Sequence, residues 1–334
     1  MDSLTQIVLG AAVGEVVLGK KVGNKAMLWG AIAGTIPDLD VAANFFVDSL
    51  TATEMHRAFT HSILFSVLFA PVLGFFISKI YKSKEVTKRE WSWLSFWALF
   101  THPILDCHTT FGTQLLWPLP HKLAFNNIFV VDPLYTIPFL VLLIIASFYK
   151  RTSRTRRRLN WIGIGISSAY LIYTLYVKLY VHNTFEKSLV EQNISYNRIS
   201  TIPAPFNSIL WTGMAETDTS YYTGSYSLLD KERKVDFIKI DHDKYKINQF
   251  NGSETLKRLK FLSKDWYTIT ERNDTLIFND IRFGPFYREL DKPEFMFGWE
   301  LHPKDGDFEV ERPEPPRDEM SKAMKVLYTR LLGK

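Results

Sequence analysis

The sequence predicts an α-helical integral membrane bundle of about six membrane segments, the first two of them short, followed by an α+β, strand-rich extracytoplasmic domain. The 334 residues are 46% hydrophobic, yet their mean hydropathy is −0.05. This mixture indicates a strongly apolar part joined to an ordinary soluble part. Long apolar runs lie in the first half, and short β-branched and aromatic runs broken by turn residues fill the second. We therefore predict two domains, at 1–181 and 182–334.

Six apolar segments make up the first predicted domain. They lie at 4–19, 26–36, 62–80, 91–107, 133–149 and 161–181. The last four approach the roughly 20 residues that span a bilayer. The first two contain Gly10-x-x-x-Gly14 and Gly30-x-x-x-Gly34, spacings that let membrane helices approach closely. We expect these two to form a packed pair, with a buried soluble hairpin as the alternative for this pair alone.

Basic residues mark every second connection between these segments. Clusters of lysine and arginine lie at 20–25, 79–89 and 151–158, whereas 37–59 and 108–131 hold only Arg57 and Lys122 as strong bases. By the positive-inside rule the basic loops face the cytoplasm. We predict a multi-pass protein of the bacterial inner (cytoplasmic) membrane, with everything after about Val181 outside. The basic clusters face anionic lipid and account for the net charge of +5, so no nucleic-acid partner is predicted.

Histidine and aspartate side chains collect at the outer ends of three predicted segments, in "PDLD" at 37–40, "HRAFTHS" at 56–62 and "THPILD" at 101–106. Any one histidine is better explained as a paired or solvent-exposed side chain. A whole set is not, because ionisable groups near a bilayer core are costly and usually mark a functional site. Imidazole and carboxylate ligands suit zinc first, with manganese or iron as alternatives. The predicted metal ligands are Asp38, Asp40, His56, His61, His102 and Asp106.

A weak repeat accompanies these motifs. "TQIVLG", "THSILF" and "THPILD" share a threonine followed by glutamine or histidine, beginning at Thr5, Thr60 and Thr101. In an Ile/Leu-rich chain this repeat can arise by chance. Its functional interpretation is that each threonine hydroxyl orients the neighbouring side chain of a metal site.

The same residues predict hydrolytic chemistry. A bound metal acidifies water and polarises a carbonyl or phosphoryl oxygen, and Asp40 or Asp106 is the predicted proton acceptor. Arg57 is the third predicted catalytic residue, because a guanidinium can grip phosphate or carboxylate. It predicts a membrane lipid, anionic or phosphorylated, as substrate. The alternative for Arg57 is an interfacial anchor on lipid head groups.

The chain resembles the YdjM-like, LexA-regulated, membrane-bound metal-dependent hydrolases over roughly its first 180 residues. The matching pieces are "MDSLTQIVLGAAVGE" at the start, "PDLD", "HRAFTHS" and "HPILDCHTTFGTQLLWP" at 102–118. Many members carry histidine where this chain has Gln6, so Gln6 is not a predicted ligand. The resemblance implies a metal-dependent hydrolase. We expect metal-activated water to attack an ester or phosphoester of a lipid-like or envelope substrate at the outer, periplasmic membrane face.

A non-catalytic membrane sensor or scaffold is the alternative function. Its metal would be structural, and its outer domain would bind a ligand or a protein. In that outer domain the sequence predicts a hairpin turn at Asn273-Asp274, a stiff connector at 312–316 and a terminal helix at 318–332. Cys107 is the only cysteine, so no internal disulfide can form, and we expect it to be a small buried apolar residue.

Overall fold

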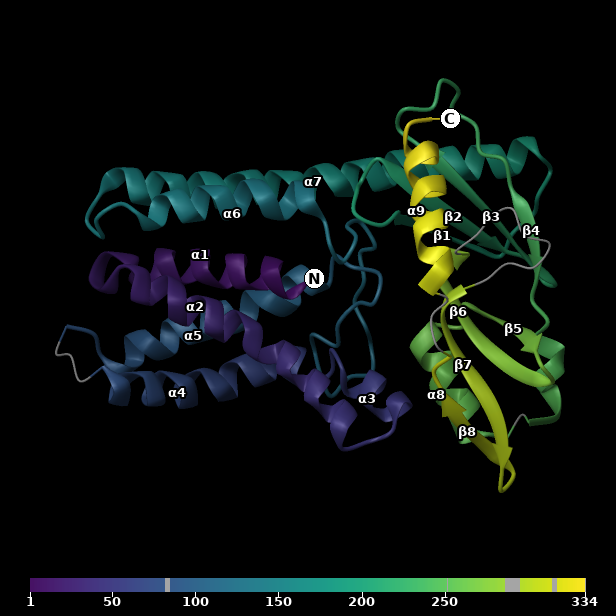
Figure 1. Cartoon of the computed structure of the whole chain (residues 1–334), viewed down its shortest axis with the longest axis horizontal. Coiled ribbons are helices and arrows are strands. Elements are labelled where there is room, and N and C mark those ends of the chain that lie inside the picture. Colours follow the sequence, from purple (N-terminus) through teal and green to yellow (C-terminus); the bar gives the residue numbers. More distant parts are fainter. Residues whose placement is uncertain (82–84, 251, 286–294, 314–316, 334) are drawn as a thin grey trace. The chain divides into compact units, whose positions relative to one another are not determined.

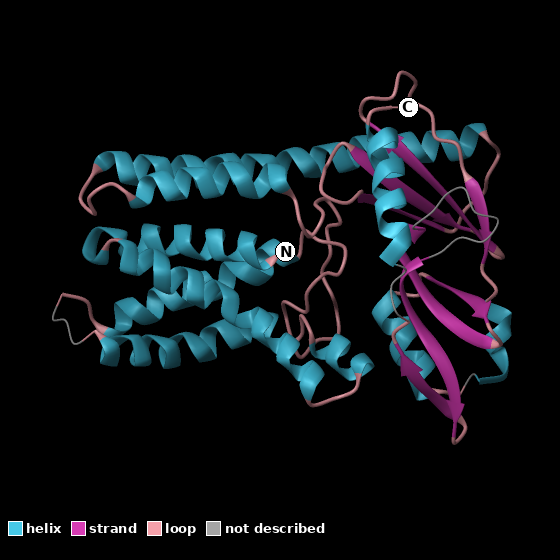
Figure 2. Cartoon of the chain, viewed as in Figure 1, coloured by secondary structure: helices cyan, strands magenta, loops and turns pink. Residues whose placement is uncertain are grey.

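The computed structural model describes residues 1–81, 85–250, 252–285, 295–313 and 317–333 (Figure 1). The chain forms two compact units. The first comprises Met1–Val47, Ala52–Tyr176 and Pro205–Asn207, and the second comprises Asp48–Thr51, Val177–Ala204 and Ser208–Lys334. Helices build the first unit, whereas the strands belong to the second (Figure 2). Part of the connector predicted at 312–316 lies outside the described residues.

A helix forms at each predicted apolar segment. The helices that contribute to the first unit are α1 (Ser3–Val22), α2 (Asn24–Thr35), η1 (Ile36–Phe45), α3 (Ser49–Met55), η2 (Phe59–His61), α4 (Ile63–Ile80), α5 (Lys88–Asp106), α6 (Pro133–Ser147) and α7 (Arg154–Glu191), of which η1 and η2 are 3-10 helices. Within the described part of the chain, α1, α4 and α7 are long and apolar enough to span a membrane, and α6 is apolar but shorter. The number of crossings and the side on which the second unit lies stay predictions.

The predicted close packing of the first two helices is confirmed. A Cβ atom added to Gly10 would lie 2.3 Å from the carbonyl oxygen of Gly30, and one added to Gly14 would lie 2.1 Å from that of Ala26. These distances are far below contact distance for two heavy atoms, so glycine is required wherever the two backbones touch. The glycines thus bring α1 and α2 into backbone contact over two turns.

Helix starts near the candidate site are capped by side chains. Ser62 directly follows η2 and accepts a hydrogen bond from the backbone N–H of Phe65, the third residue of α4. Asp132 caps α6 in the same way through Leu134 and Tyr135, and Pro133 occupies the first turn, where no N–H is needed. The cap at Ser62 fixes the point at which α4 begins, two residues after His61.

The second unit contains two four-stranded antiparallel sheets. The first has the order β1-β2-β3-β4 and the second the order β5-β6-β7-β8, so neighbours in the chain are neighbours in each sheet. Their elements are β1 (Arg198–Pro203), β2 (Leu210–Glu216), β3 (Ser220–Ser227), β4 (Ile238–Asp241), η3 (Lys244–Phe250), α8 (Glu254–Ser263), β5 (Tyr267–Arg272), β6 (Thr275–Pro285), β7 (Phe295–Lys304), β8 (Asp307–Glu311) and α9 (Arg317–Leu331). The predicted hairpin turn is confirmed, with positive φ at Asn273 and Asp274, and α9 confirms the predicted terminal helix.

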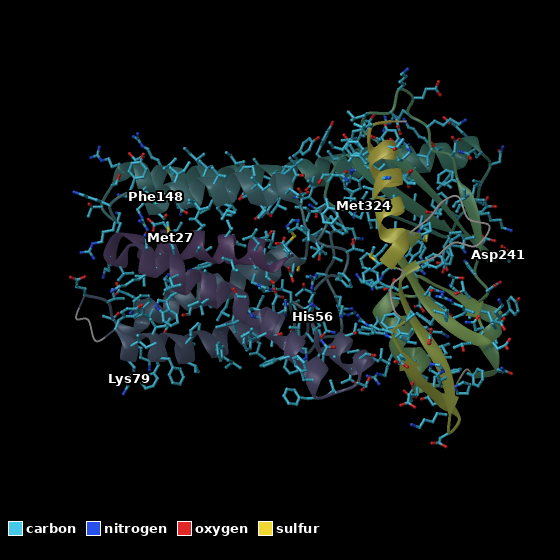
Figure 3. The ribbon with its side chains drawn as sticks, in the orientation of Figure 1. Met27, His56, Lys79, Phe148, Asp241 and Met324 are labelled. Atoms are coloured by element: carbon cyan, nitrogen blue, oxygen red, sulfur yellow. The ribbon has the colours of Figure 1, made fainter. Side chains whose placement is uncertain are left out.

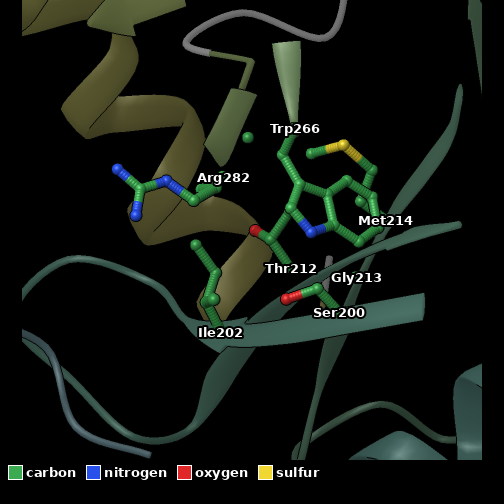
Figure 4. A pocket seen from close by; sticks show the side chains of 8 residues that line it. Ser200, Ile202, Thr212, Gly213, Met214, Trp266 and Arg282 are labelled. Atoms are coloured by element: carbon green, nitrogen blue, oxygen red, sulfur yellow. The ribbon is translucent and has the colours of Figure 1, made fainter. Parts of the chain in front are cut away.

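The second sheet has a core of its own, formed with α8 and η3. Leu50, from the short segment Asp48–Thr51, packs with Leu259, Ile269 and Phe278 in this core. A small pocket between the sheets is lined by Ser200, Ile202, Thr212, Gly213, Met214, Trp266, Arg282 and Gly284 (Figure 4). The indole of Trp266 lies beside Met214, and the Arg282 guanidinium is bound to Asp280, so the pocket is a packing gap with mainly apolar walls.

A buried ion pair joins α1 to α7. The guanidinium of Arg156 donates to both carboxylate oxygens of Glu15, with Nε to Oε1 at 2.7 Å and Nη2 to Oε2 at 2.6 Å. Its Nη1 also donates to Asn24 Oδ1 at 2.7 Å. Both charged side chains are almost fully buried. Such a pair is weak evidence for net stability, but removal of one partner leaves an uncompensated charge away from water.

We predict that Arg156→Ala lowers the free energy of unfolding by about 3–5 kcal/mol, because Glu15 then stays buried without its partner. Thermal unfolding of the detergent-solubilised chain would measure this as a large fall in midpoint temperature. Arg157→Ala is the matched control, since Arg157 is exposed on the next position of the same helix. Equal midpoints for the two variants would show that the pair is not needed.

Candidate metal centre

Four of the six predicted ligands meet at one point. Asp38 comes from η1, His61 from η2, and His102 and Asp106 from one face of the last turn of α5. One ligand atom from each lies within 4.8 Å of the others. The two imidazole Nε2 atoms are 3.1 Å apart, and Asp38 Oδ1 lies 3.3 and 3.4 Å from them. We refer to these four side chains as the metal cluster.

The spacing of the cluster fits a small metal ion. Asp106 Oδ2 lies 3.5 Å from His61 Nε2 and 3.8 Å from His102 Nε2. Four ligands placed tetrahedrally around zinc at about 2.0–2.1 Å would be separated by about 3.3 Å. Three of the four side chains are fully buried, and the fourth, Asp38, is 16% exposed.

Hydrogen bonds at Nδ1 fix both imidazole rings. His102 Nδ1 lies 2.6 Å from the carbonyl oxygen of Gly34, which can only accept, so Nδ1 donates. His61 Nδ1 lies 3.1 Å from Thr60 Oγ1 and 3.3 Å from a carboxylate oxygen of Asp40. A neutral ring that donates at Nδ1 carries its lone pair at Nε2. The two Nε2 lone pairs are therefore directed at the same space, which a cation would stabilise.

Asp106 has one satisfied and one unsatisfied oxygen. Oδ1 accepts from Gln6 Nε2 at 2.9 Å and also contacts the amino group of Met1. Oδ2 is buried and makes no hydrogen bond, although Arg57 Nε lies 3.3 Å away. A buried carboxylate oxygen without a hydrogen bond is costly. Oδ2 is the oxygen that faces the two histidines, so it is suited to act as a metal ligand.

Asp40 and His56 lie beside the cluster and not within it. His56 Nδ1 is 2.7 Å from Asp40 Oδ1, and Asp40 Oδ2 accepts from Thr60 Oγ1 at 2.7 Å and from the backbone N–H of Arg57 at 3.2 Å. Burial would raise the pKa of Asp40, but hydrogen bonds from His56 and His61 outweigh burial and lower this pKa below its usual range. Asp40 is thus an ionised partner that orients His61.

Asp38 shows the same balance of effects. Burial would raise the pKa of its carboxyl, but the imidazoles of His102 and His61, whose Nε2 atoms face Asp38 Oδ1, lower it overall. Asp38 is therefore a carboxylate at neutral pH, which is the form that binds a metal. Its position on η1 makes it the cluster member that is accessible from outside the protein.

Arg57 is held by protein groups. Its side chain is almost fully buried, and its Nη1 donates to Thr109 Oγ1 at 2.7 Å. The guanidinium also lies over the ring of Phe111. Its backbone is left-handed, with φ of 61°, a conformation that costs a non-glycine residue energy and that often occurs at functional sites. In this structure Arg57 faces Asp106, and its predicted contact with a substrate anion stays a prediction.

Several supporting residues were not predicted as part of the site. Gly34 contributes a carbonyl oxygen and therefore has no side-chain signature, and Thr109 links Arg57 to the carbonyl of Asp106. The threonine repeat gave a partial signal. Thr60 does contact its neighbouring histidine, whereas Thr101 bonds the backbone of Trp97 and Thr5 lies beside Thr136. Gln6 is in the site as a donor to Asp106.

The free cysteine lies next to the cluster in sequence. Cys107 follows Asp106 and is buried, as expected. Its sulfur is not among the ligand atoms that converge in the described part of the chain.

Comparison with known proteins agrees with the motifs. The profile of the YdjM inner membrane protein family matches residues 1–181, which include every member of the metal cluster. Neither a curated protein nor a solved structure matches the chain. The family match covers more than half of the 334 residues and contains the apolar helices described above. The chain therefore belongs to the YdjM inner membrane protein family, and it is a membrane protein with a histidine and aspartate cluster suited to a metal ion.

Proposed function

We propose that this protein is a metal-dependent hydrolase of the inner membrane. One observation carries the proposal: two buried Nε2 atoms and a buried Asp106 oxygen that makes no hydrogen bond are directed at the same space. His61, His102 and Asp106 would hold the ion. Two imidazoles and one carboxylate suit zinc, and the same donor set also suits iron or manganese. We propose zinc as the resident metal.

The chemistry follows from the accessible side of the cluster. A divalent metal held there would supply a Lewis acid and would lower the pKa of water toward 7. Asp38 is the one partly exposed member, so water and substrate reach the cluster on its side. We assign Asp38 as the general base that takes a proton from the attacking water. Asp106 and Asp40 are less suited to that step, because one is a buried ligand and the other is bound by His56 and Thr60.

The substrate is proposed to be an ester or phosphoester of a lipid-like or envelope molecule, attacked at the outer face of the membrane. The location of the cluster at the ends of apolar helices supports a substrate that the membrane contains. Arg57 supports the cluster by placing its positive charge beside Asp106, which lowers the cost of a buried carboxylate. We propose an anionic lipid as the substrate class. Its anionic group would bind the Arg57 guanidinium in place of Thr109.

One observation favours a second function, a sensor or scaffold with a structural metal. The cluster holds four protein ligand atoms, and four protein ligands are typical of structural zinc sites, whereas catalytic sites usually have three and a water. The two functions differ in what Asp38 does. In the hydrolase it is a base at an open position, and in the sensor it is the fourth permanent ligand.

We predict that His61→Ala, His102→Ala and Asp106→Ala each abolish stoichiometric metal binding. Each variant removes a ligand atom that the buried site cannot replace. Elemental analysis of the purified chain would measure the metal content. His121→Ala is the matched control, because His121 is exposed in the loop that follows α5 and is not a cluster member. Full metal content in all three ligand variants would contradict the shared site.

Asp38→Ala separates the two functions. For the hydrolase, we predict that the variant keeps its metal and loses about 10²–10⁴-fold in turnover, the usual contribution of general acid–base catalysis. Metal content and product release from extracted envelope lipids would be measured on the same preparation. Loss of the metal itself in Asp38→Ala would favour the structural site.

The Asp40→Asn variant tests whether the Asp40 carboxylate orients the His61 ring for metal binding. We predict a decrease in metal affinity of about 10–100-fold, because the amide cannot hold the imidazole as the carboxylate does. Competition with a chelator of known affinity would measure it. Glu54→Gln is the control, a carboxylate of α3 that lies outside the cluster. The role of Asp40 would be refuted by equal affinities in the two variants.

A further inference from the structure

The helix η1 and the residue that follows it, Phe46, carry an exposed apolar surface next to the cluster. We call this the η1 apolar surface and define it by four side chains and their exposed fractions: Leu39 62%, Val41 52%, Phe45 85% and Phe46 85%. The two charged residues of the same segment, Asp38 and Asp40, are turned toward the histidines. Such a concentration of exposed apolar side chains marks a surface that contacts lipid or an apolar partner.

This surface continues the lipid-facing side of the bundle. η2 packs against both η1 and α4. Only 22% of the apolar window of α4 is buried within the protein, so most of its side chains face outward, as expected for contact with lipid. Phe59, an exposed residue of η2, has its ring centroid 4.9 Å from that of Trp117. Tryptophan is typical of the membrane interface.

The cluster and the η1 apolar surface share one short helix. Asp38, the accessible cluster member, and Phe45 are seven residues apart, which is about 14 Å along a 3-10 helix. One lipid tail extends over a similar depth, since two opposed tails make up the hydrocarbon core of about 30 Å. A lipid whose tail lies along η1 would therefore place its polar linkage near Asp38.

The chemistry of the surface favours lipid over a protein partner. From residue 39 to residue 47, the exposed side chains are apolar except for that of Asn44. A protein interface usually has a polar rim around its apolar centre. The chain is also a membrane protein, so a hydrocarbon phase is available to cover this surface.

We infer that the η1 apolar surface lies in the membrane hydrocarbon and binds the tail of a membrane lipid, so that the metal cluster opens at the boundary between lipid and water. The inference that the bound lipid is the substrate rests on the proposed function. The inference that η1 contacts lipid does not, so either inference can fail without the other.

The first test measures the surroundings of η1 in the full-length chain in nanodiscs of phosphatidylethanolamine and phosphatidylglycerol. Phe45→Cys and Phe46→Cys would each carry a nitroxide label, with Phe76→Cys on α4 as the lipid reference and Asp305→Cys in the β7–β8 turn as the water reference. The unsubstituted chain, whose single cysteine is buried, gives the labelling background. We expect the ratio of oxygen to nickel-chelate accessibility at 45 and 46 to match that at 76 and to exceed that at 305 severalfold.

Every other outcome of that test overturns the inference. High accessibility to the nickel chelate would place η1 in water. Low accessibility to both reagents would show that protein covers the surface, either a second copy or another part of the chain. Metal content is measured on the same samples, so that absence of metal with a lipid-like label would reject the proposed function and leave the lipid contact intact.

The second test measures lipid at the cluster. The probe is phosphatidylglycerol with a diazirine near its ester linkage, and the readout is the label on the peptide that contains Asp38. We expect labelling to fall severalfold in Phe45→Glu/Phe46→Glu and to stay unchanged in Phe148→Glu. Phe148 is a matched control because it is 84% exposed and lies at the opposite end of the helical unit from His56 (Figure 3). Equal labelling of the two variants would overturn the docking role of η1.

Discussion

The structure of the site depends on one constraint, the convergence of imidazole and carboxylate atoms from three separate segments of the chain. Two imidazole nitrogens and two carboxylate oxygens face the same small space, and three of the four side chains are fully buried. Burial costs these carboxylates their solvation, and Arg57 and the amino group of Met1 offset part of that cost at Asp106. A metal ion would lower the cost further, since it would attract all four atoms. A bound ion would therefore help to hold the ends of η1, η2 and α5 together at this point.

The close packing of α1 and α2 supports that convergence, because both helices contribute groups that hold cluster side chains. A Cβ atom at Gly34 would lie 3.0 Å from the backbone oxygen of Gln6, so the two helices touch where Gly34 offers its carbonyl to His102. From the facing turn of α1, Gln6 reaches Asp106. Glycines that serve packing therefore also set the ring orientation of one ligand and hold the carboxylate of another. A larger side chain in this contact would disturb the metal cluster without touching it.

The sequence predicted what depends on residue type and missed what depends on backbone position. Apolar runs predicted where helices form, and histidines and aspartates in short motifs predicted the chemistry of the cluster. The sequence could not decide between Asp38 and Asp40, which are two residues apart and differ only in the direction that a 3-10 helix gives them. It also missed the carbonyl of Gly34. Likewise, Leu50 is a single apolar residue in a polar stretch, and the core that buries it comes from residues 200 positions later.

The exposure of Asp38 decides whether a metal bound at the cluster could act on a substrate. A site closed on all sides can only stabilise a fold, whereas a site with one exposed carboxylate admits water and a substrate. Here the opening lies on a helix whose remaining exposed side chains are almost all apolar. A water-soluble substrate would have to cross that apolar surface, while a lipid would gain from contact with it. The ten residues of η1 would therefore also select for molecules that the membrane supplies.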